Sequence, residues 1–229
     1  MKNKIDVSII CCCNNKQKLN EYLLKGYERQ NSACEVIVVE NENNRFESAA
    51  KALNYGASVS KGKVLIFCHQ DIEFLSEDCL DNIYEILKEK DIIIGAAGSV
   101  PKMKCIISWM DEERSEGMYT YNPALPEQPT LVQTLDECII AMRKDTYESV
   151  RFDEEVCDGW HLYSADICLS ALELGIESYV IPLKICHHSQ GRADKNFFRI
   201  AKKLVKKHKK KNKAIKTACI YIKNTSVPF

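Results

Sequence analysis

The stretch Gly62-Lys63-Val64-Leu65-Ile66-Phe67-Cys68-His69-Gln70-Asp71-Ile72-Glu73-Phe74 contains an apolar run that ends abruptly in polar side chains. The run is short and rich in Val, Ile and Phe, which is typical of a strand buried on both faces. Asp71 follows it, and burying a carboxylate is unfavourable unless another group pairs with it. Because open α/β sheets bind ligands at the carboxyl ends of their strands, we predict that Asp71 meets a divalent metal with a phosphate behind it. The alternative is an aspartate in the turn before a helix that begins near Ser76.

Two earlier apolar runs also end in polar residues. Residues 6–12 lead to Asn14, and residues 34–41 end in Glu40 and Asn41. Helical spacing separates the three runs, and this β-α-β-α-β alternation predicts a parallel sheet with right-handed crossovers. The three strand ends then lie at one edge of the sheet, where an acid after the second strand can accept hydrogen bonds from a ribose or a base.

The rest of the chain continues the alternation of helices and strands. We predict helices at residues 19–27, 45–60, 76–90, 144–149, 165–175 and 196–216, and further strands at residues 91–99, 134–142 and 177–183. Between them, residues 100–133 are irregular, and a connection of this length is usually functional or mobile. The first strand is followed by neither GxGxxG nor GxxxxGK[ST], which argues against a Rossmann dinucleotide site and a P-loop. The fold class is therefore α/β with a mostly parallel central sheet flanked by helices.

Composition limits the class of protein. The 229 residues are 45% hydrophobic and 28% charged, as in ordinary globular proteins. We find no window of about 18 uncharged apolar residues and no signal-peptide pattern, so we expect a cytoplasmic protein without a spanning helix. The 12 cysteines form no C-x-x-C pair. They indicate reduced, buried thiols rather than disulfides or a zinc site.

The net charge of zero conceals an asymmetry. Residues 192–229 hold thirteen basic residues and one acid, so residues 1–191 carry a net charge near −12. Three interpretations of this basic helical extension stay open: a solvated helix that covers the domain, attraction to anionic lipid headgroups at the inner face of a membrane, or nucleic-acid binding. The last is weakest, because no aromatic residues interleave with the lysines, and we expect no nucleic-acid partner.

The order and spacing of these pieces resemble the family 2 glycosyltransferases of the GT-A fold, in particular the branch described as similar to a streptomycin-biosynthesis protein. The resemblance makes residues 1–191 the GT-A domain and residues 192–229 an extension. The matching pieces are residues 7–10 leading to Asn14, 38–41, 53–57, 60–62, 67–71, 159–166 and 187–189.

The resemblance implies a nucleotide-diphosphate-sugar donor, a divalent metal (Mn or Mg) held by a DxD-type motif, and inverting transfer to a hydroxyl of a glycan or lipid-linked acceptor. The motif reads His69-Gln70-Asp71 here, so the metal role passes to Asp71 only. The donor-binding candidates are Asn14, Glu40, Asn41, Asn54, Lys61, His69 and Gln70. The metal between the phosphates would neutralise charge on the departing diphosphate.

The fold also returns a histidine toward the metal, and this chain has two candidates, His187 and His188. Neighbouring residues on a strand point in opposite directions, so we expect only one to reach the site, and we favour His188. The alternative is one packed and one solvated histidine.

Inverting transfer needs a base, and the resemblance places it near the helix that begins at about residue 164. Relatives carry two acids there, whereas this chain has Ser164 and then Asp166. Asp166 is either the base or an acid that stabilises its helix through the macrodipole. The reserve candidates are Asp158, Asp136 and Glu137. Trp160 is either an apolar platform for an acceptor sugar, with Asp158 beside it, or a core residue.

The altered motif and Ser164 motivate a rival hypothesis, a nucleotide-sugar-binding protein without catalysis. A nucleotidyltransferase is disfavoured, because no Gly-rich loop bearing Arg or Lys follows the first strand.

Overall fold

A seven-stranded sheet forms the centre of the protein in a computed structural model that describes residues 2–100, 106–114, 117–120, 128–189, 194–212 and 214–223. Its strand order is β10-β13-β5-β12-β3-β1-β2. The strands are β1 (Asn3–Cys13), β2 (Ser32–Glu40), β3 (Val64–His69), β5 (Ile93–Gly95), β10 (Thr130–Val132), β12 (Ile139–Arg143) and β13 (Ser178–Val180).

Most of this sheet runs in one direction. β1 pairs in parallel with β2 and β3, and β13 pairs in parallel with β5. Only β12, inserted antiparallel between β3 and β5, and the edge strand β10 run the other way. The predicted order of the first three strands is confirmed, and their carboxyl ends meet at one edge.

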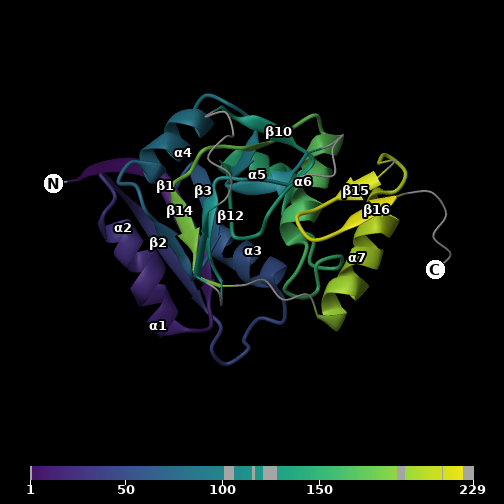
Figure 1. Cartoon of the computed structure of the whole chain (residues 1–229), viewed down its shortest axis with the longest axis horizontal. Coiled ribbons are helices and arrows are strands. Elements are labelled where there is room, and N and C mark those ends of the chain that lie inside the picture. Colours follow the sequence, from purple (N-terminus) through teal and green to yellow (C-terminus); the bar gives the residue numbers. More distant parts are fainter. Residues whose placement is uncertain are drawn as a thin grey trace.

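Helices cover both faces of the sheet (Figure 1). Apolar residues of the π-helix η1 (Leu19–Leu24) and of α4 (Cys79–Leu87) pack on one face, against side chains such as Ile9 and Ile66. Side chains of α3 (Ala49–Val59) and α6 (Tyr163–Glu173) pack on the other face, against Ile10 and Phe67. Both faces of β3 are therefore buried, as its apolar run predicts. The remaining helices are α1 (Lys16–Lys18), α2 (Lys25–Glu28), α5 (Lys144–Val150) and α7 (Lys195–His208).

Smaller sheets surround the carboxyl edge of the central sheet. One has the order β11-β6-β7 and another the order β4-β14-β8-β9, while β15 and β16 form a hairpin. The bounds are β4 (Ile72–Phe74), β6 (Ala97–Ser99), β7 (Ile106–Ser108), β8 (Met110–Arg114), β9 (Gly117–Thr120), β11 (Thr134–Leu135), β14 (Ile185–His187), β15 (Ala214–Lys216) and β16 (Tyr221–Lys223).

Four predicted elements differ from the structure. Residues 100–133, predicted to be irregular, contain the strands β7, β8, β9 and β10, which pair with distant segments such as β14 and β13. Residues 91–99 form two short strands in different sheets, and at Gly98 an added Cβ would lie 2.6 Å from the Thr134 carbonyl oxygen, so the two backbones pack too closely for a larger residue. Residues 134–142 are likewise divided between β11 and β12. The predicted helix at 196–216 ends at His208, where the backbone and side-chain N–H groups of Asn212 both donate to the His208 carbonyl, and the hairpin follows.

The C-terminal segment lies at the opposite end of the molecule from α1 and α2 (Figure 1). The apolar stripe of α7, including Ile200 and Leu204, packs on Leu162 and Leu169 of the α6 region. The described residues contain no helix that is long and apolar enough to cross a membrane.

Candidate metal and donor site

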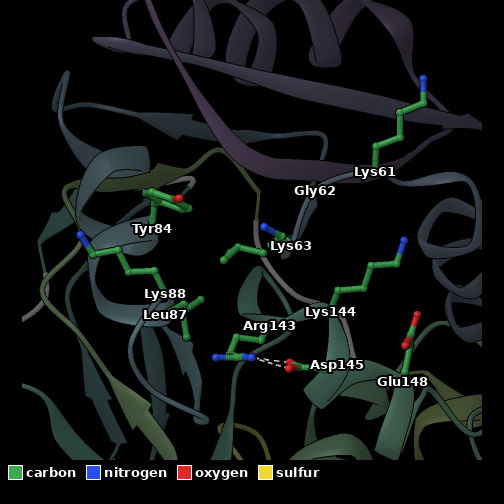
Figure 2. Close-up of a pocket in the computed structure, with 11 residues that line it drawn as sticks. Lys61, Gly62, Lys63, Tyr84, Leu87, Lys88, Arg143, Lys144, Asp145 and Glu148 are labelled. Atoms are coloured by element: carbon green, nitrogen blue, oxygen red, sulfur yellow. Dashed lines mark hydrogen bonds and ion pairs between the residues drawn. The ribbon is translucent and has the colours of Figure 1, made fainter.

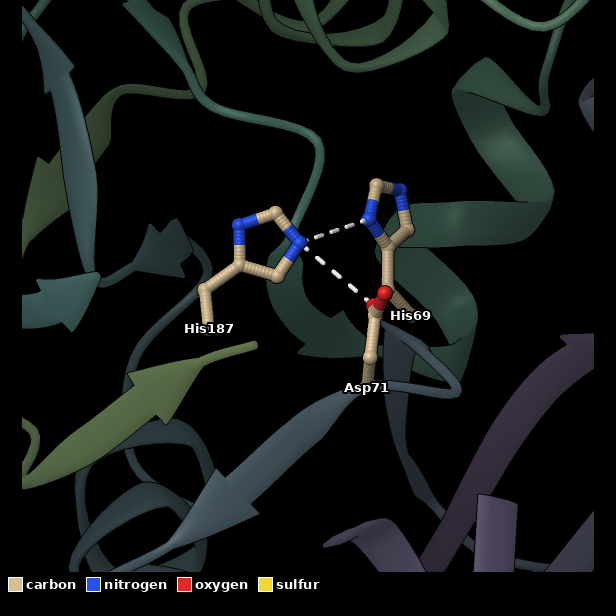
Figure 3. A group of neighbouring side chains, drawn as sticks. All are labelled: His69, Asp71 and His187. Atoms are coloured by element: carbon tan, nitrogen blue, oxygen red, sulfur yellow. Dashed lines mark hydrogen bonds and ion pairs between the residues drawn. The ribbon is translucent and has the colours of Figure 1, made fainter. Parts of the chain in front are cut away.

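Strand pairing brings three metal-capable side chains together at the carboxyl edge of the sheet. His69 ends β3, and Asp71 lies between β3 and β4. β14 pairs antiparallel with β4, so that His187 lies opposite Ile72 and the His188 N–H donates to the Asp71 carbonyl at 2.9 Å. This register places the His187 ring beside the Asp71 carboxylate, as Figure 3 shows.

The three side chains share one small volume. His187 Nε2 lies 3.4 Å from His69 Nδ1 and 3.4 Å from Asp71 Oδ1. One nitrogen or oxygen atom from each residue lies within 4.8 Å of the others. Two imidazoles and a carboxylate are a donor set that divalent transition metals such as Mn²⁺ accept. The residues therefore fit the predicted ion, with His69 as an additional ligand candidate.

Burial and charge prepare these groups for a cation. Burial, and then the neighbouring His187, lower the pKa of His69 to about 4, so its imidazole is neutral at physiological pH. Burial opposes ionisation of Asp71, but its hydrogen bond to His187 and the nearby positive charges outweigh this and hold the pKa of the carboxyl well below its usual range. The site thus presents a neutral imidazole and an ionised carboxylate, the forms that bind metals.

His188, which the sequence favoured over His187, does not join this group. Its Nε2 lies 2.8 Å from Glu73 Oε2, and its ring stacks on Tyr22 at 3.9 Å between centroids. The two histidines point to opposite sides, as strand alternation predicts, but the structure places His187 rather than His188 next to Asp71.

Three predicted donor-binding residues lie at the same edge of the sheet. The Gln70 Oε1 accepts hydrogen bonds from the backbone N–H groups of Asn14 and Asn15 at 3.1 and 2.9 Å, and Gln70 Nε2 donates to Asn14 Oδ1 at 2.6 Å. This amide pair fastens the carboxyl end of β1 to that of β3. Glu40 ends β2 at the same edge and is exposed, with Lys16 3.1 Å away. Asn14 and Gln70 therefore lie next to the metal group, and Glu40 lies at the same edge on the next strand but one; their role in donor binding stays a prediction.

Two other predicted donor residues, Asn41 and Asn54, have structural partners. Asn41 is buried, and its side chain binds both the N–H and the carbonyl of Phe46. Asn54, on α3, donates to the Phe152 carbonyl and to Glu154 and accepts from the Tyr147 hydroxyl. Neither amide belongs to the metal group, and both make their hydrogen bonds to other parts of the fold.

Lys61 lies at the other end of β3 from Asp71. It precedes the first residue of the strand, and its N–H donates to Glu35. There it lines a separate cavity of about 500 Å³ with Lys63 and Lys144, shown in Figure 2. The prediction that Lys61 binds the same donor as Asp71 is not supported by this placement, because a residue before a strand and one after it lie at opposite edges of the sheet.

The acid predicted as the base, Asp166, is turned toward α7. It is only 1% exposed, and its two oxygens lie 2.8 Å from His208 Nε2 and 2.8 Å from Lys207 Nζ. Asp158 likewise pairs with Arg199 and Lys203. Ser164 is fully buried, and its hydroxyl donates to the carbonyls of Leu135 and Asp136. These three side chains connect elements and do not line the cavity next to the metal group.

A second cavity of about 500 Å³ opens directly onto the metal group. His69 and His187 line it together with two acids from the reserve candidates, Asp136 and Glu137, and with Trp160. Trp160 is 43% exposed, so it is a surface side chain and not a core residue. Burial raises the pKa of Glu137 well above its usual value, and Asp136 adds to the effect. Glu137 is therefore the acid of this pair that resists ionisation.

Two residues that the sequence reasoning missed complete the site. Lys18 Nζ lies 3.2 Å from Asp71 Oδ2, and the Tyr163 hydroxyl lies 3.0 Å from His69 Nε2. Lys18 follows the carboxyl end of β1, so the same strand-end argument that selected Asn14 could have found it. Tyr163 comes from α6, and no local pattern links it to His69.

Comparisons with known proteins identify the class. A model of the glycosyltransferase like family matches residues 8–216, so the chain belongs to that family. A sequence relative is the ATP synthase subunits region ORF 6 of Fuscovulum blasticum, 27% identical over 210 residues, which cover 88% of this chain and 83% of that protein.

Solved structures share the fold. GalNAc-T7 with UDP, GalNAc and Mn²⁺ matches with a TM-score of 0.60 at 13% identity, over 86% of this chain and 48% of that chain. S. aureus TarS 1–349 with UDP-GlcNAc matches with 0.60 at 14%, over 93% and 67%. A mannosyltransferase from Pyrobaculum calidifontis with GDP-Man and Mn²⁺ matches with 0.57 at 14%, over 83% and 59%. The chain thus spans about half of the GalNAc-T7 chain, and the predicted α/β GT-A fold is confirmed.

Proposed function

We propose that the protein transfers a sugar from a nucleotide-diphosphate donor to an acceptor hydroxyl, with inversion, in the synthesis of a glycan or glycoconjugate. The observation that carries the proposal is the group of His69, Asp71 and His187 at the carboxyl edge of the sheet, open to a cavity that also holds an acid. The fold neighbours that carry UDP, UDP-GlcNAc or GDP-Man support this class of donor.

The chain's own residues have separate tasks at this site. His69, Asp71 and His187 would hold Mn²⁺ or Mg²⁺, which when bound supplies positive charge to the departing diphosphate. Gln70 and Asn14 fix the rim on the nucleotide side through their paired amides. Glu40, exposed at the same edge, would accept hydrogen bonds from the ribose. Tyr163 holds the His69 ring by its contact with Nε2.

Asp136 is the base in this proposal, in place of Asp166. It lines the cavity with both histidines, and its Oδ1 accepts a hydrogen bond from the Cys138 N–H at 3.0 Å, which orients the carboxylate. In the transfer, the acceptor oxygen forms a new bond to the sugar C1 while the bond from C1 to the diphosphate breaks. The acceptor proton passes to Asp136, and the nucleoside diphosphate leaves.

A donor-hydrolysis screen tests the proposal. UDP-, GDP- and dTDP-sugars are incubated with the protein, with and without Mn²⁺, and released sugar and nucleotide are measured. We expect Mn²⁺-dependent release from one nucleotide class, with Asp71→Asn and Asp136→Asn each reducing it at least about 100-fold. Asp136→Asn should keep the donor affinity, whereas Asp71→Asn should lose it.

Two outcomes would contradict parts of this proposal. Release that survives Asp71→Asn would remove the metal assignment. Donor binding without turnover for every donor and acceptor would favour the rival hypothesis of a nucleotide-sugar-binding protein that lacks catalysis.

A further inference from the structure

The C-terminal segment lines the same cavity as the metal group. The wall next to His69 and His187 includes Phe197 of α7 and the turn at residues 217–219. One interpretation of the basic extension at residues 192–229 is a helix that covers the domain. The structure shows this segment beside α6 (Figure 1).

Hydrogen bonds hold the hairpin in this position. The Gln133 side chain pairs with β15 as a strand would, donating to the Ala214 carbonyl at 2.9 Å and accepting from the Lys216 N–H at 2.9 Å. Next to it, the Thr134 hydroxyl donates to the Lys216 carbonyl at 2.6 Å. Both anchors lie on the segment that leads directly into Asp136, so the hairpin and the proposed base are positioned together.

The turn itself is well ordered by its own bonds. The Thr217 hydroxyl oxygen accepts from the N–H groups of Cys219 and Ile220, and the Thr217 N–H donates to the Ile220 carbonyl at 2.8 Å. These bonds close a tight turn that presents Ala218 and Cys219 to the cavity. Hydrogen bonds therefore define the conformation of the turn that lines the cavity.

Ion pairs also hold α7 against the body of the protein. Asp158 pairs with Arg199 and Lys203 at 2.6 and 2.7 Å, and the buried Asp166 pairs with Lys207 and His208. The acidic body of the chain thus neutralises one face of the basic helix. This fixes Phe197, whose ring packs edge-on to His161 at 5.6 Å, in the cavity wall.

One part of the cavity lining is polar and the other part is mainly apolar. Around the metal group the lining is polar, with His69, Asp136 and His187. The lining that comes from other elements is mainly apolar: Ile106, Met110, Trp160, Leu162, Phe197 and Ala218. A volume of about 500 Å³ is in the range of small-molecule sites, and such a mixed lining suits a ligand with one polar and one apolar part.

We propose that α7 and the turn at residues 217–219 form the far wall of the acceptor subsite, and that this subsite takes an acceptor whose reacting hydroxyl is carried next to an apolar group. This inference rests on the proposed function, because it assigns the metal end of the cavity to the donor. The apolar group lies against Trp160, Phe197 and Ala218, and the hydroxyl lies toward Asp136.

Matched acceptors test the apolar part of the subsite. Transfer is measured from the donor that the hydrolysis screen identifies to the benzyl and the methyl glycoside of the same sugar, for a set of common hexoses. We expect kcat/KM to be at least about tenfold higher for the benzyl member of the active pair, because its ring is removed from water. Equal values for the two glycosides would overturn the assignment.

Two variants test the wall. Ala218→Trp should fill the cavity and reduce transfer to the benzyl glycoside at least about tenfold more than it reduces hydrolysis of the donor, because the added ring lies at the acceptor end of the cavity. Lys210→Trp adds the same bulk at an exposed position outside the cavity and should leave both reactions unchanged. Unchanged transfer by Ala218→Trp would overturn the inference, whereas loss of donor hydrolysis in the unmodified protein would instead contradict the proposed function.

A measurement without turnover gives an independent check. Cys219 is exposed and lines the cavity, so a maleimide reagent should label it. Bound benzyl glycoside should cause loss of labelling at Cys219 relative to the methyl glycoside, and Cys219→Ser identifies the labelled site. Labelling that is insensitive to the benzyl glycoside at every concentration would place the acceptor elsewhere.

Discussion

Asp71 and Asp166 are both buried aspartates next to a histidine, yet their surroundings differ. Asp71 is 6% exposed and lies among groups that retain metal-binding atoms facing a cavity. Asp166 is 1% exposed, and His208 and Lys207 of a neighbouring helix occupy its oxygens. Burial alone therefore does not distinguish the two carboxylates. Both have partners from the folded chain, but those of Asp71 include a histidine that lines a cavity, whereas those of Asp166 lie in a packed contact between helices.

The largest expected effect concerns the structural aspartate. Asp166→Asn should lower the free energy of unfolding by about 3–5 kcal/mol, because it removes the buried carboxylate that pairs with Lys207 and His208 and leaves them only the more exposed Asp153 and Glu173. Urea unfolding measures this change. Asp158→Asn is the matched control, since its side chain is 35% exposed and its ion pairs with α7 should contribute no more than about 1 kcal/mol. Asp166→Asn with unchanged stability and abolished transfer would restore Asp166 as the base.

The next effect is a pH dependence at His69. Burial, and then His187, lower its pKa from 6.5 to about 4, so between these pH values the unfolded chain binds more protons than the folded one. Stability should therefore fall as the pH decreases from about 6.5 to about 4, by up to about 3 kcal/mol from this group. Urea unfolding over this pH range, with a chelator present, measures the slope. His69→Gln should flatten it, and an identical slope in both proteins would contradict the assignment.

A smaller effect separates the two adjacent histidines. His187→Ala should weaken Mn²⁺ binding at least about 100-fold, because loss of even an outer partner of a metal ligand costs about 10–100-fold. His188→Ala should change it little, since His188 binds Glu73 and stacks on Tyr22 instead. Isothermal titration with Mn²⁺ compares the two variants. The opposite ranking would return the metal role to His188.

The smallest effect is expected at Ser164. Ser164→Ala should cost about 1–2 kcal/mol of unfolding free energy, because the Leu135 and Asp136 carbonyls lose a buried hydrogen-bond donor. Mn²⁺ affinity should stay unchanged, because Ser164 does not belong to the metal group. Thermal unfolding and Mn²⁺ titration of the same variant test both statements. A large loss of Mn²⁺ affinity would show that Ser164 supports the metal group around Asp71.

The sequence predicted that the strand ends around Asp71 meet at one edge of the sheet, because a local pattern marks each of these ends. An apolar run followed by polar residues marks the end of a buried strand, and parallel pairing brings such ends together without further information. The same argument could have excluded Lys61, which precedes the strand, and could have included Lys18. The predicted elements before residue 90 accordingly correspond to observed ones, with ends shifted by a few residues.

The region around Asp166 could not be predicted in this way. Its partners lie about 40 residues further along the chain on α7, and nothing in the local sequence distinguishes an acid that stabilises its own helix from one that pairs with another helix. The choice between His187 and His188 has the same origin. Alternation predicts that the two diverge, but only the register between β4 and β14 determines which one lies beside Asp71.

That register makes the site sensitive to a change of chain length. β14 has only three residues, and its pairing with β4 sets His187 opposite Ile72. A single residue inserted or deleted in the connection from β13 to β14 would shift this pairing by one position and exchange the sides to which the two histidines point. An insertion in this short connection would therefore remove an imidazole from the metal group without altering any of its residues.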